Sequence, residues 1–430
     1  MFLLARHKSH AEFIKVTTFL LLAVGVISLL WIGPIMVNPD STQFLQGSPI
    51  RSPIYSLLLK GYQYFFHNNF YPLIGFQILL GMGSVWYFSS QVQRLYHLND
   101  GLWFLILLIM LSPYVYGDYK FGNRILSEAI CYPMYLIAIV QLIKGLSQHT
   151  WRPLLNFSVL TFLLILIRKQ FIFIYPVFIA AVIYVWAYFY TSPIKYKFTA
   201  AFIGVFLLTG LLEKTYAYVQ FNHFSSQPTS GFDLVIPLLY LSTPEDAEKI
   251  KDPNLRVIFS EIMALNHHHQ DTLQDSKQIR VAHYYFHYMS IYNEIMWHNL
   301  LSVLEKKGVT NWYDINPIAL KLALNLLAIH PIAYAKLFLY GLQYKLGGYY
   351  MAGLLFFAWG VSFIYHLKNR DPLTLAVCLT LALAFSNNGL IAMVEPFIRR
   401  YTSYTETMQT VFLIILIFLA MKNSNKIVPS

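Results

Sequence analysis

The chain has 430 residues, of which 57% are hydrophobic and only 12% are charged. Soluble domains carry about 25% charged residues, so the composition excludes an ordinary soluble protein and indicates a multi-pass membrane protein. In a soluble chain the net charge of +11 would suggest nucleic acid as a partner. In a membrane protein it indicates basic loops facing anionic lipid, so membrane lipid is the expected partner and nucleic acid is not.

Apolar segments recur along the chain, and a membrane-spanning helix needs about 20 largely apolar residues. The first segment lacks an Ala-x-Ala cleavage signature, so we interpret it as a retained transmembrane helix and not as a signal peptide. About ten spans are expected, at residues 16–37, 71–89, 102–116, 127–143, 154–167, 171–190, 198–212, 349–365, 373–385 and 402–421.

The orientation follows from the basic residues in the loops. With the N-terminus inside, the cytoplasmic segments hold a large share of the lysines and arginines, as the positive-inside bias requires. These residues are Arg6, Lys8, Lys15, Arg94, Lys144, Arg152, Lys195, Lys197, Lys368, Arg370, Lys422 and Lys426. We expect a plasma (inner) membrane protein whose active site lies on the extracytoplasmic face.

The predicted fold is an all-α membrane protein with interfacial helices and a helical extracytoplasmic loop domain. Residues 1–216 would form an N-terminal transmembrane module with the catalytic outer loops, 217–316 the loop domain, and 317–430 an interfacial helix and the C-terminal transmembrane helices. Segments 52–66 and 330–346 have the pattern of helices that lie along the interface.

A long helix is expected inside the loop domain. Asp275 or Ser276 can cap its start, and it would end before Gly308. Its apolar stripe consists of Val281, Tyr285, Tyr288, Tyr292 and Ile295.

Metal ligands are sparse or badly placed. The two cysteines, Cys131 and Cys378, lie in apolar segments, so neither a disulfide framework nor a zinc–thiolate site is expected. One stripe of the long predicted helix carries His283, His287, Glu294 and His298, and residues 267–269 are all histidine. A single helix brings only neighbouring pairs together, so we interpret this stripe as a solvated polar face and expect no metal or other cofactor.

Charged groups gather on the predicted outer face, where placing them at the hydrocarbon boundary costs free energy. Asp40, just after the first span, stands out because acids contribute little to topology. A carboxylate beside a cleft can take a proton from an attacking hydroxyl, and guanidinium groups can hold a departing phosphate. Asp40 is therefore the candidate base, and the other charged residues of this face are candidates for contact with substrate: Arg51, Asp118, Lys120, Arg124, Glu128, Arg168, Lys169, Glu395, Arg399 and Arg400.

Short motifs on this face resemble those of the GT-C class of membrane glycosyltransferases, which includes protein mannosyltransferases, the bacterial aminoarabinose transferase and the mannosyltransferases of lipid-anchor assembly. The first-loop motif is Pro39-Asp40-Ser41-x-x-Phe44, followed by Gly47-Ser48-Pro49-x-Arg51-Ser52-Pro53. The other motifs are Ile125-Leu126-Ser127-Glu128, Ile167-Arg168-Lys169-Gln170 and Arg399-Arg400-Tyr401.

The resemblance implies an inverting transfer of a sugar from a polyprenyl-phosphate donor lipid to a glycan, lipid or protein acceptor. It implies two catalytic residues, Asp40 as the base and Glu128 as an acid that positions substrate. It also implies Arg168 and Arg400 as phosphate binders and adds Tyr401 to the expected substrate-binding residues. Ser41 stands where some relatives have a second acid. Two alternatives remain: a transporter or flippase of lipid-linked sugars, and a glycan polymerase or ligase that uses a diphosphate-linked oligosaccharide.

Overall fold

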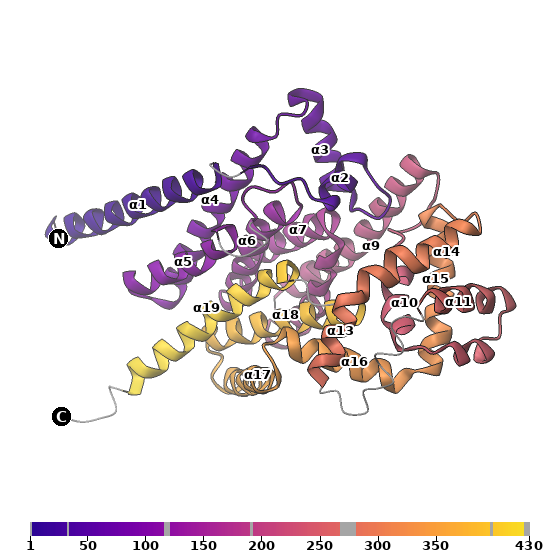
Figure 1. The fold of residues 1–430 in the computed structure, drawn as a ribbon. Helices are drawn as coiled ribbons and strands as arrows, with labels where there is room; N and C mark the ends of the chain where they lie inside the picture. Colours follow the sequence, from indigo (N-terminus) through magenta and orange to yellow (C-terminus); the bar gives the residue numbers. More distant parts are fainter. Residues whose placement is uncertain are drawn as a thin grey trace.

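A computed structural model describes residues 2–31, 34–115, 121–189, 192–266, 281–395 and 399–424. Within these ranges the regular structure is entirely helical, and the one strand-like contact is an isolated bridge between Met36 and Arg124. The expected all-α fold is confirmed for the described part of the chain. The helices form two groups, a bundle and a smaller domain at one end of it (Figure 1).

The bundle contains a helix for each apolar segment identified in the sequence. α6 lies at its centre and is buried along nearly its whole length, packed between α4 and α7. The bundle helices are α1 (Phe2–Trp31), α4 (Tyr71–Tyr96), α5 (Asp100–Val115), α6 (Glu128–Ser147), α7 (Trp151–Ile167), α8 (Ile174–Tyr188), α9 (Ile194–Phe221), α17 (Tyr349–Asn369), α18 (Pro372–Val394) and α19 (Arg399–Ser424).

The outer surface of the bundle is apolar, as a lipid-facing surface requires. Leu207 on α9 is 61% exposed and Phe357 on α17 is 71% exposed. In the described part of the chain, seven helices are long and apolar enough to cross a membrane, or eight if the bent pair α15–α16 forms one span. α5 and α7 have only 16 and 17 residues, and the expected count of ten spans is not confirmed.

The first helix ends earlier than the apolar pattern predicts. The expected segment 16–37 continues past the end of α1 at Trp31, whereas residues 34–38 are not helical. Pro34 supplies the physical reason, because proline cannot donate the backbone hydrogen bond that a continuing helix needs. The chain then turns into α2 (Pro39–Gln46) and α3 (Pro53–Phe66), so the segment 52–66 is helical as expected.

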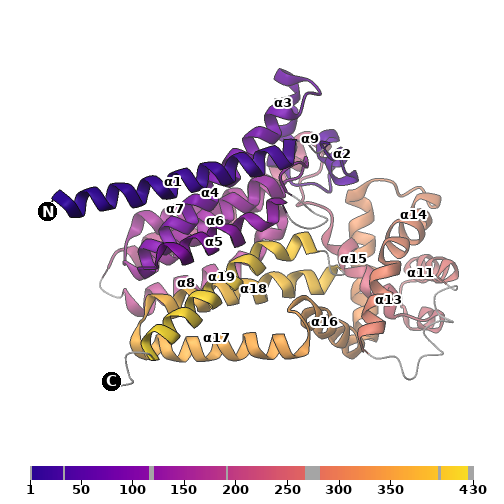
Figure 2. The same cartoon turned by 60° about the vertical axis from the view of Figure 1, so that its left-hand side comes forward.

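A second hydrophobic core organises the smaller group, which we call the helical domain (Figure 2). The core contains Phe232, Phe259, Leu304 and Leu326, all nearly inaccessible. Its elements are α10 (Ser230–Leu241), η2 (Pro244–Lys249), α11 (Pro253–Leu265), α13 (Val281–Asn293), η3 (Glu294–Leu300), α14 (Leu301–Lys306), α15 (Trp312–Ile329) and α16 (Pro331–Lys345). The domain packs on the bundle where α10 and α16 contact α18.

Two expected features of this domain can be located. Of the predicted stripe, Tyr285, Tyr288, Tyr292 and Ile295 are buried in the second core, while the expected capping residues lie outside the described ranges. The predicted boundary after residue 316 falls inside α15, which places core residues on both sides of it.

A sharp corner separates α15 from α16, which are bent by 101° relative to each other. His330 lies at this corner, and its Nε2 is 2.7 Å from Oδ2 of the buried Asp246 on η2. Lys249 Nζ lies 2.8 Å from the other oxygen of the same carboxylate.

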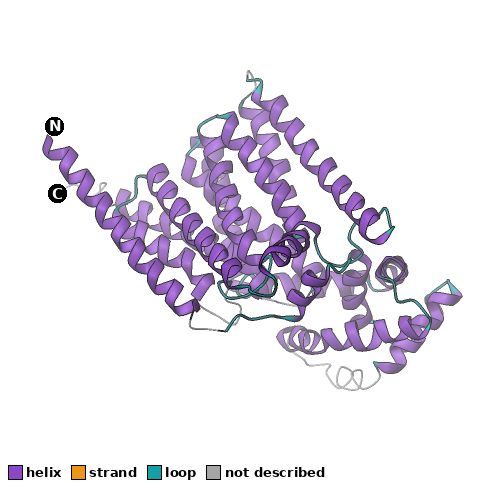
Figure 3. Cartoon of the chain, turned by 90° about the horizontal axis from the view of Figure 1, so that it is seen from above, coloured by secondary structure: helices purple, strands orange, loops and turns teal. Residues whose placement is uncertain are grey.

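Figure 3, seen from above, shows the helical domain beside the bundle at one end.

A close approach of two backbones holds the helical domain together. Gly231 on α10 packs so tightly on α15 that a Cβ atom would lie 2.4 Å from the Asn316 carbonyl oxygen and 2.6 Å from the Leu320 amide nitrogen. The Gly231 amide also donates to Asn316 Oδ1 at 2.8 Å. Only glycine fits at this crossing, because the obstructing atoms are backbone and cannot rotate away.

We therefore predict that Gly231→Ala destabilises the protein by about 1 to 3 kcal/mol through overpacking between α10 and α15. The measurement is thermal unfolding of the purified protein in detergent, together with limited proteolysis of the helical domain. Gly210→Ala is the control, because no atom lies within 4 Å of a Cβ at that position. Equal stability of the two variants would show that the crossing tolerates a side chain.

Candidate functional site

A short parallel contact brings the two expected catalytic acids to neighbouring helix starts. The Met36 amide donates to the Asn123 carbonyl at 2.9 Å, and Asn123 Nδ2 donates to the Pro34 carbonyl at 3.2 Å. The two segments run in the same direction. The helices that follow them, α2 and α6, consequently begin close together, with Asp40 and Glu128 in their first turns.

Asp40 is paired with a cation from its own loop. Arg51 Nη2 lies 2.5 Å from Asp40 Oδ1, and Arg51 Nε donates to Gln43 Oε1 at 2.7 Å. The side chains of Asp40 and Arg51 are each 21% exposed, so the pair borders open space. α2 ends at Gly47, whose φ of +68° allows the chain to return so that Arg51 faces Asp40.

Ser41 has a structural role at the position where some relatives of the GT-C class have a second acid. Its Oγ accepts from the Asn38 amide at 3.0 Å and completes the cap of α2. Its side chain is fully buried. The first loop therefore supplies Asp40 as its one carboxylate.

Glu128 forms a buried ion pair with Arg168. Arg168 Nη1 lies 3.0 Å from Glu128 Oε2, and the Glu128 side chain is fully buried. Ser127 Oγ donates to the same carboxylate oxygen at 3.3 Å. Each charge is stabilised by a helix dipole, since Glu128 starts α6 and Arg168 follows the last residue of α7.

Arg168 and the two residues after it form a short segment, residues 168–170, that we call the 168–170 turn. Lys169 and Gln170 of this turn contact α3, α9, α18 and α19. The Lys169 amide donates to Ser52 Oγ at 3.1 Å, at the start of α3, and Lys169 Nζ lies 3.2 Å from Glu213 Oε2 on α9. Gln170 Nε2 donates at 2.9 Å both to Asn387 Oδ1 on α18 and to the Tyr401 carbonyl on α19.

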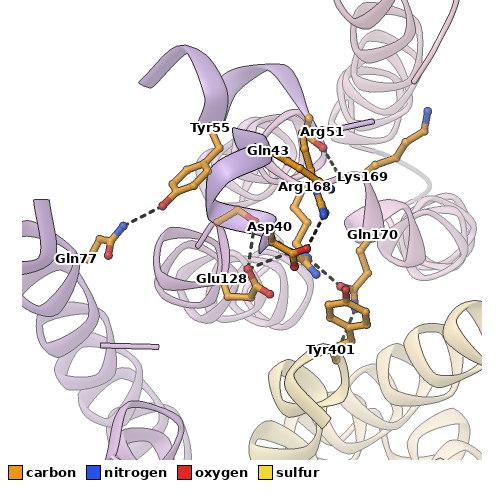
Figure 4. Close-up of polar contacts among 12 residues, drawn as sticks. Asp40, Gln43, Arg51, Tyr55, Gln77, Glu128, Arg168, Lys169, Gln170 and Tyr401 are labelled. Carbon is orange, nitrogen blue, oxygen red and sulfur yellow. Dashed lines mark hydrogen bonds and ion pairs between the residues drawn. The ribbon is translucent and has the colours of Figure 1, made fainter. Parts of the chain in front are cut away.

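Arg168 is held on three sides. Besides its contact with Glu128, its Nε donates to Gln170 Oε1 at 2.9 Å, and its Cζ lies 4.7 Å from the centre of the Tyr401 ring. Figure 4 shows the side chains of Asp40, Glu128, Arg168 and Tyr401 close together. The site thus presents carboxylates and guanidinium groups with fixed orientations.

Six of the expected site residues come together here: Asp40, Arg51, Glu128, Arg168, Lys169 and Tyr401. Arg124 is buried beside the Met36 bridge, and Glu395 ends α18 with its carbonyl accepting from Lys345 Nζ at 3.2 Å. Asp118 and Lys120 lie outside the described residues, as do the side chains of Arg399 and Arg400 at the start of α19. In the described ranges, no group of three metal-ligating side chains converges.

Several residues of this site are not among those predicted from the sequence. Glu213 and Asn387 are both buried within long apolar helices. A polar residue inside an apolar segment is often functional, and this position could have identified both residues from the sequence. Gln170 was noticed only as part of a motif, and its amide proves to connect Arg168 with Asn387 and α19.

Asp233, on α10 of the helical domain, is a further missed acid. Burial raises its pKa to about 8, and the neighbouring Glu395 adds to this effect. A hydrogen bond with the Thr229 side chain and the positive charges of Arg51 and Lys169 act in the opposite direction. Asp233 thus interacts electrostatically, from the helical domain, with Arg51 and Lys169 of the site.

The raised pKa of Asp233 predicts a pH-dependent stability. Between about pH 4 and pH 8 the folded protein keeps a proton on Asp233 that the unfolded chain releases, so the free energy of unfolding falls as the pH rises through this window. In Asp233→Asn this contribution is absent, and the decrease in melting temperature from about pH 5 to pH 8 should be smaller than in the wild type. Asp314→Asn, which changes an exposed acid on α15, serves as the control. The same pH profile in all three proteins would contradict the assignment.

Comparisons with protein-family models, with curated proteins and with solved structures find no match to this chain. The resemblance to the GT-C class therefore rests on the short motifs, and the functional argument rests on the arrangement of Asp40, Arg51, Glu128 and Arg168.

Proposed function

We propose that the protein is a membrane glycosyltransferase of GT-C type that moves a sugar from a polyprenyl-phosphate donor to an acceptor on the extracytoplasmic face, with inversion. The observation that carries the proposal is the grouping of a partly exposed carboxylate, Asp40, with two fixed guanidinium groups, Arg51 and Arg168, at one end of an apolar helical bundle. The reaction needs a base for the acceptor and cations for the leaving phosphate, and this grouping offers both.

Asp40 is the proposed general base. The adjacent guanidinium of Arg51 favours the ionised carboxylate, which is the form that accepts a proton. In the transfer, the acceptor oxygen forms a bond to the anomeric carbon of the sugar while the bond from that carbon to the phosphate oxygen breaks. The hydroxyl proton passes to Asp40, and the bonding pair leaves with the phosphate. A positioned base of this kind contributes about 10²- to 10⁴-fold to the rate.

Arg168 is the proposed phosphate-binding residue. Guanidinium groups hold phosphate through paired N–H donors, and negative charge on the phosphate grows as the bond to the sugar breaks. Glu128, Gln170 and Tyr401 hold Arg168 in place, so little reorganisation accompanies the reaction. Lys169, next in the chain, and Arg400 add positive charge in this proposal.

The distribution of basic residues supports an extracytoplasmic location for the site. Lys144, Arg152, Lys195 and Lys368 lie near the ends of α6, α7, α9 and α17 that are opposite to the ends joined to the site or to the helical domain. Cytoplasmic ends of membrane helices are enriched in such residues. We therefore propose that Asp40 and the helical domain face the outside of the plasma membrane.

The central test is Asp40→Asn, which keeps the size of the side chain but removes the base. We expect transfer to fall at least 100-fold while the donor lipid accumulates, because no other carboxylate lies in the first loop. Membrane lipids of wild type and variant are compared by mass spectrometry with an isotope-labelled sugar. Asp314→Asn, which removes an exposed acid in the first turn of α15, is the matched control.

Normal transfer by Asp40→Asn would remove Asp40 from the mechanism. A labelled lipid that changes membrane leaflet with its sugar–phosphate bond intact would identify a transporter instead of a transferase.

Arg168→Lys tests the phosphate role separately. Lysine keeps the positive charge but lacks the planar set of donors that contacts Glu128, Ser127 and Gln170. Loss of a charge-assisted hydrogen bond corresponds to about 1.5 to 3 kcal/mol, so the KM for the donor lipid should rise about 10- to 100-fold. Arg256→Lys is the control, since Arg256 also makes two hydrogen bonds but lies in the helical domain. An unchanged KM in Arg168→Lys would contradict the proposed contact.

A further inference from the structure

A polar cavity lies next to the part of α18 that contacts the candidate site. Its volume is about 360 Å³, and the turn between α16 and α17, α18 and α19 surround it. Asn387 and Asn388 are consecutive residues of α18: Asn387 contacts Gln170 and Tyr401 of the candidate site, whereas Asn388 lines the cavity. Figure 2 shows α18 running between α17 and α19, with α16 at one end of them.

Lys345 supplies a buried amino group to the cavity. It is the last residue of α16 and only 4% exposed, and its Nζ donates to the Glu395 carbonyl at 3.2 Å. Burial disfavours the charged form of an amino group, and a nearby negative charge favours it. An anion in the cavity would therefore stabilise the protonated form of Lys345 and gain a charge-assisted contact with it.

Asn388 supplies an acceptor. The residue is 1% exposed, and its Nδ2 donates to the Ala384 carbonyl one turn earlier in α18, at 2.9 Å. Its Oδ1 is buried and has no hydrogen-bond partner within the described residues. Buried acceptors of this kind are rare in folded proteins, because each costs roughly 1 to 3 kcal/mol when left unpaired. A ligand hydroxyl in the cavity would satisfy it.

α19 contributes the remaining polar wall. Glu406, Gln409 and Thr410 lie one turn apart on the same side of this helix, inside a segment that is otherwise apolar enough to span a membrane. Polar side chains at such depth are usually functional. Glu406 would repel a bare phosphate, but its carboxylate accepts readily from hydroxyl groups.

Exposed apolar side chains lie near the cavity. Apolar side chains at the start of α17 are exposed, with Met351 at 47% and Leu354 at 61%. Ile417, two turns beyond Thr410 on α19, is 59% exposed. Acyl chains can cover such residues, while the cavity itself is lined by polar groups.

We propose that this cavity binds the head group of an anionic membrane lipid that carries free hydroxyl groups, as phosphatidylglycerol does. The phosphate would lie at Lys345, and the glycerol hydroxyls would donate to Asn388 Oδ1 and to Glu406. The volume is typical of small-molecule sites and matches a glycerol-phosphate group. The proposal does not depend on glycosyl transfer, because Asp40, Arg51, Glu128 and Arg168 do not line the cavity.

The test is lipid binding by the purified full-length protein, measured by native mass spectrometry and by melting temperature in neutral detergent. The probes are phosphatidylglycerol, phosphatidic acid with no glycerol head, phosphatidylcholine with no net charge, and soluble glycerol 3-phosphate. We expect saturable binding and a raised melting temperature with phosphatidylglycerol, weaker effects with phosphatidic acid, and none with phosphatidylcholine.

Two variants and two matched controls localise the binding. Lys345→Gln and Asn388→Leu should each weaken phosphatidylglycerol binding at least tenfold. Lys336→Gln removes an exposed lysine from the same helix, and Asn325→Leu removes an asparagine whose Nδ2 makes the same one-turn hydrogen bond on α15, to Lys321 at 2.8 Å. Both controls should bind like the wild type. Because Asn388 Oδ1 has no partner to lose, Asn388→Leu is expected to fold even if Lys345→Gln does not.

Three results would overturn the proposal. Equal binding of phosphatidylglycerol and phosphatidylcholine would show that the charge is not recognised. Unchanged phosphatidylglycerol binding in Asn388→Leu would place the lipid elsewhere. Stabilisation by soluble glycerol 3-phosphate, with none by the lipid, would assign the cavity to a soluble phosphate.

Discussion

The buried ion pair between Glu128 and Arg168 is the interaction on which the arrangement of the site depends, because it fixes the 168–170 turn against the start of the central helix. Burying both charges is favourable only when good geometry and further hydrogen bonds offset the loss of hydration. Ser127, Gln170 and the ring of Tyr401 meet that requirement. Lys169 and Gln170 of the same turn contact α3, α9, α18 and α19. The 168–170 turn, which follows α7, therefore sets the positions of most of the site.

Polar contacts join the first loop to the bundle and to the helical domain, in addition to the hydrophobic core that the first loop shares with the bundle. The bridge at Met36 holds the first loop to the segment before α6, and Gln227, just before the helical domain, donates to the Ile50 carbonyl. Asp233 then brings a carboxyl group from the helical domain toward Arg51 and Lys169. Charges in the first loop, the bundle and the helical domain are thus interdependent, although the helical domain has a hydrophobic core separate from the one that the first loop and the bundle share.

Much of the fold could be predicted from the sequence, because apolar segments of span length specify helices almost by themselves. The ends of the helices were less predictable. α1 ends before Pro34, and the segment starting at Pro39 forms a separate helix. The pairing of Asp40 with Arg51, and of Glu128 with Arg168, could be expected only as proximity on one face. Glu213, Asp233 and Asn387 could not be assigned to the site, since their roles depend on how distant helices pack.

The corner between α15 and α16 has a mechanical consequence. α16 leaves this corner at His330, which Asp246 holds, and it ends at Lys345 in the wall of the polar cavity. α16 therefore runs from the corner in the helical domain to the wall of the cavity beside α18 and α19. A change in the angle between α15 and α16 would move Lys345 relative to α18 and α19, so the width of the cavity depends on the geometry of this corner.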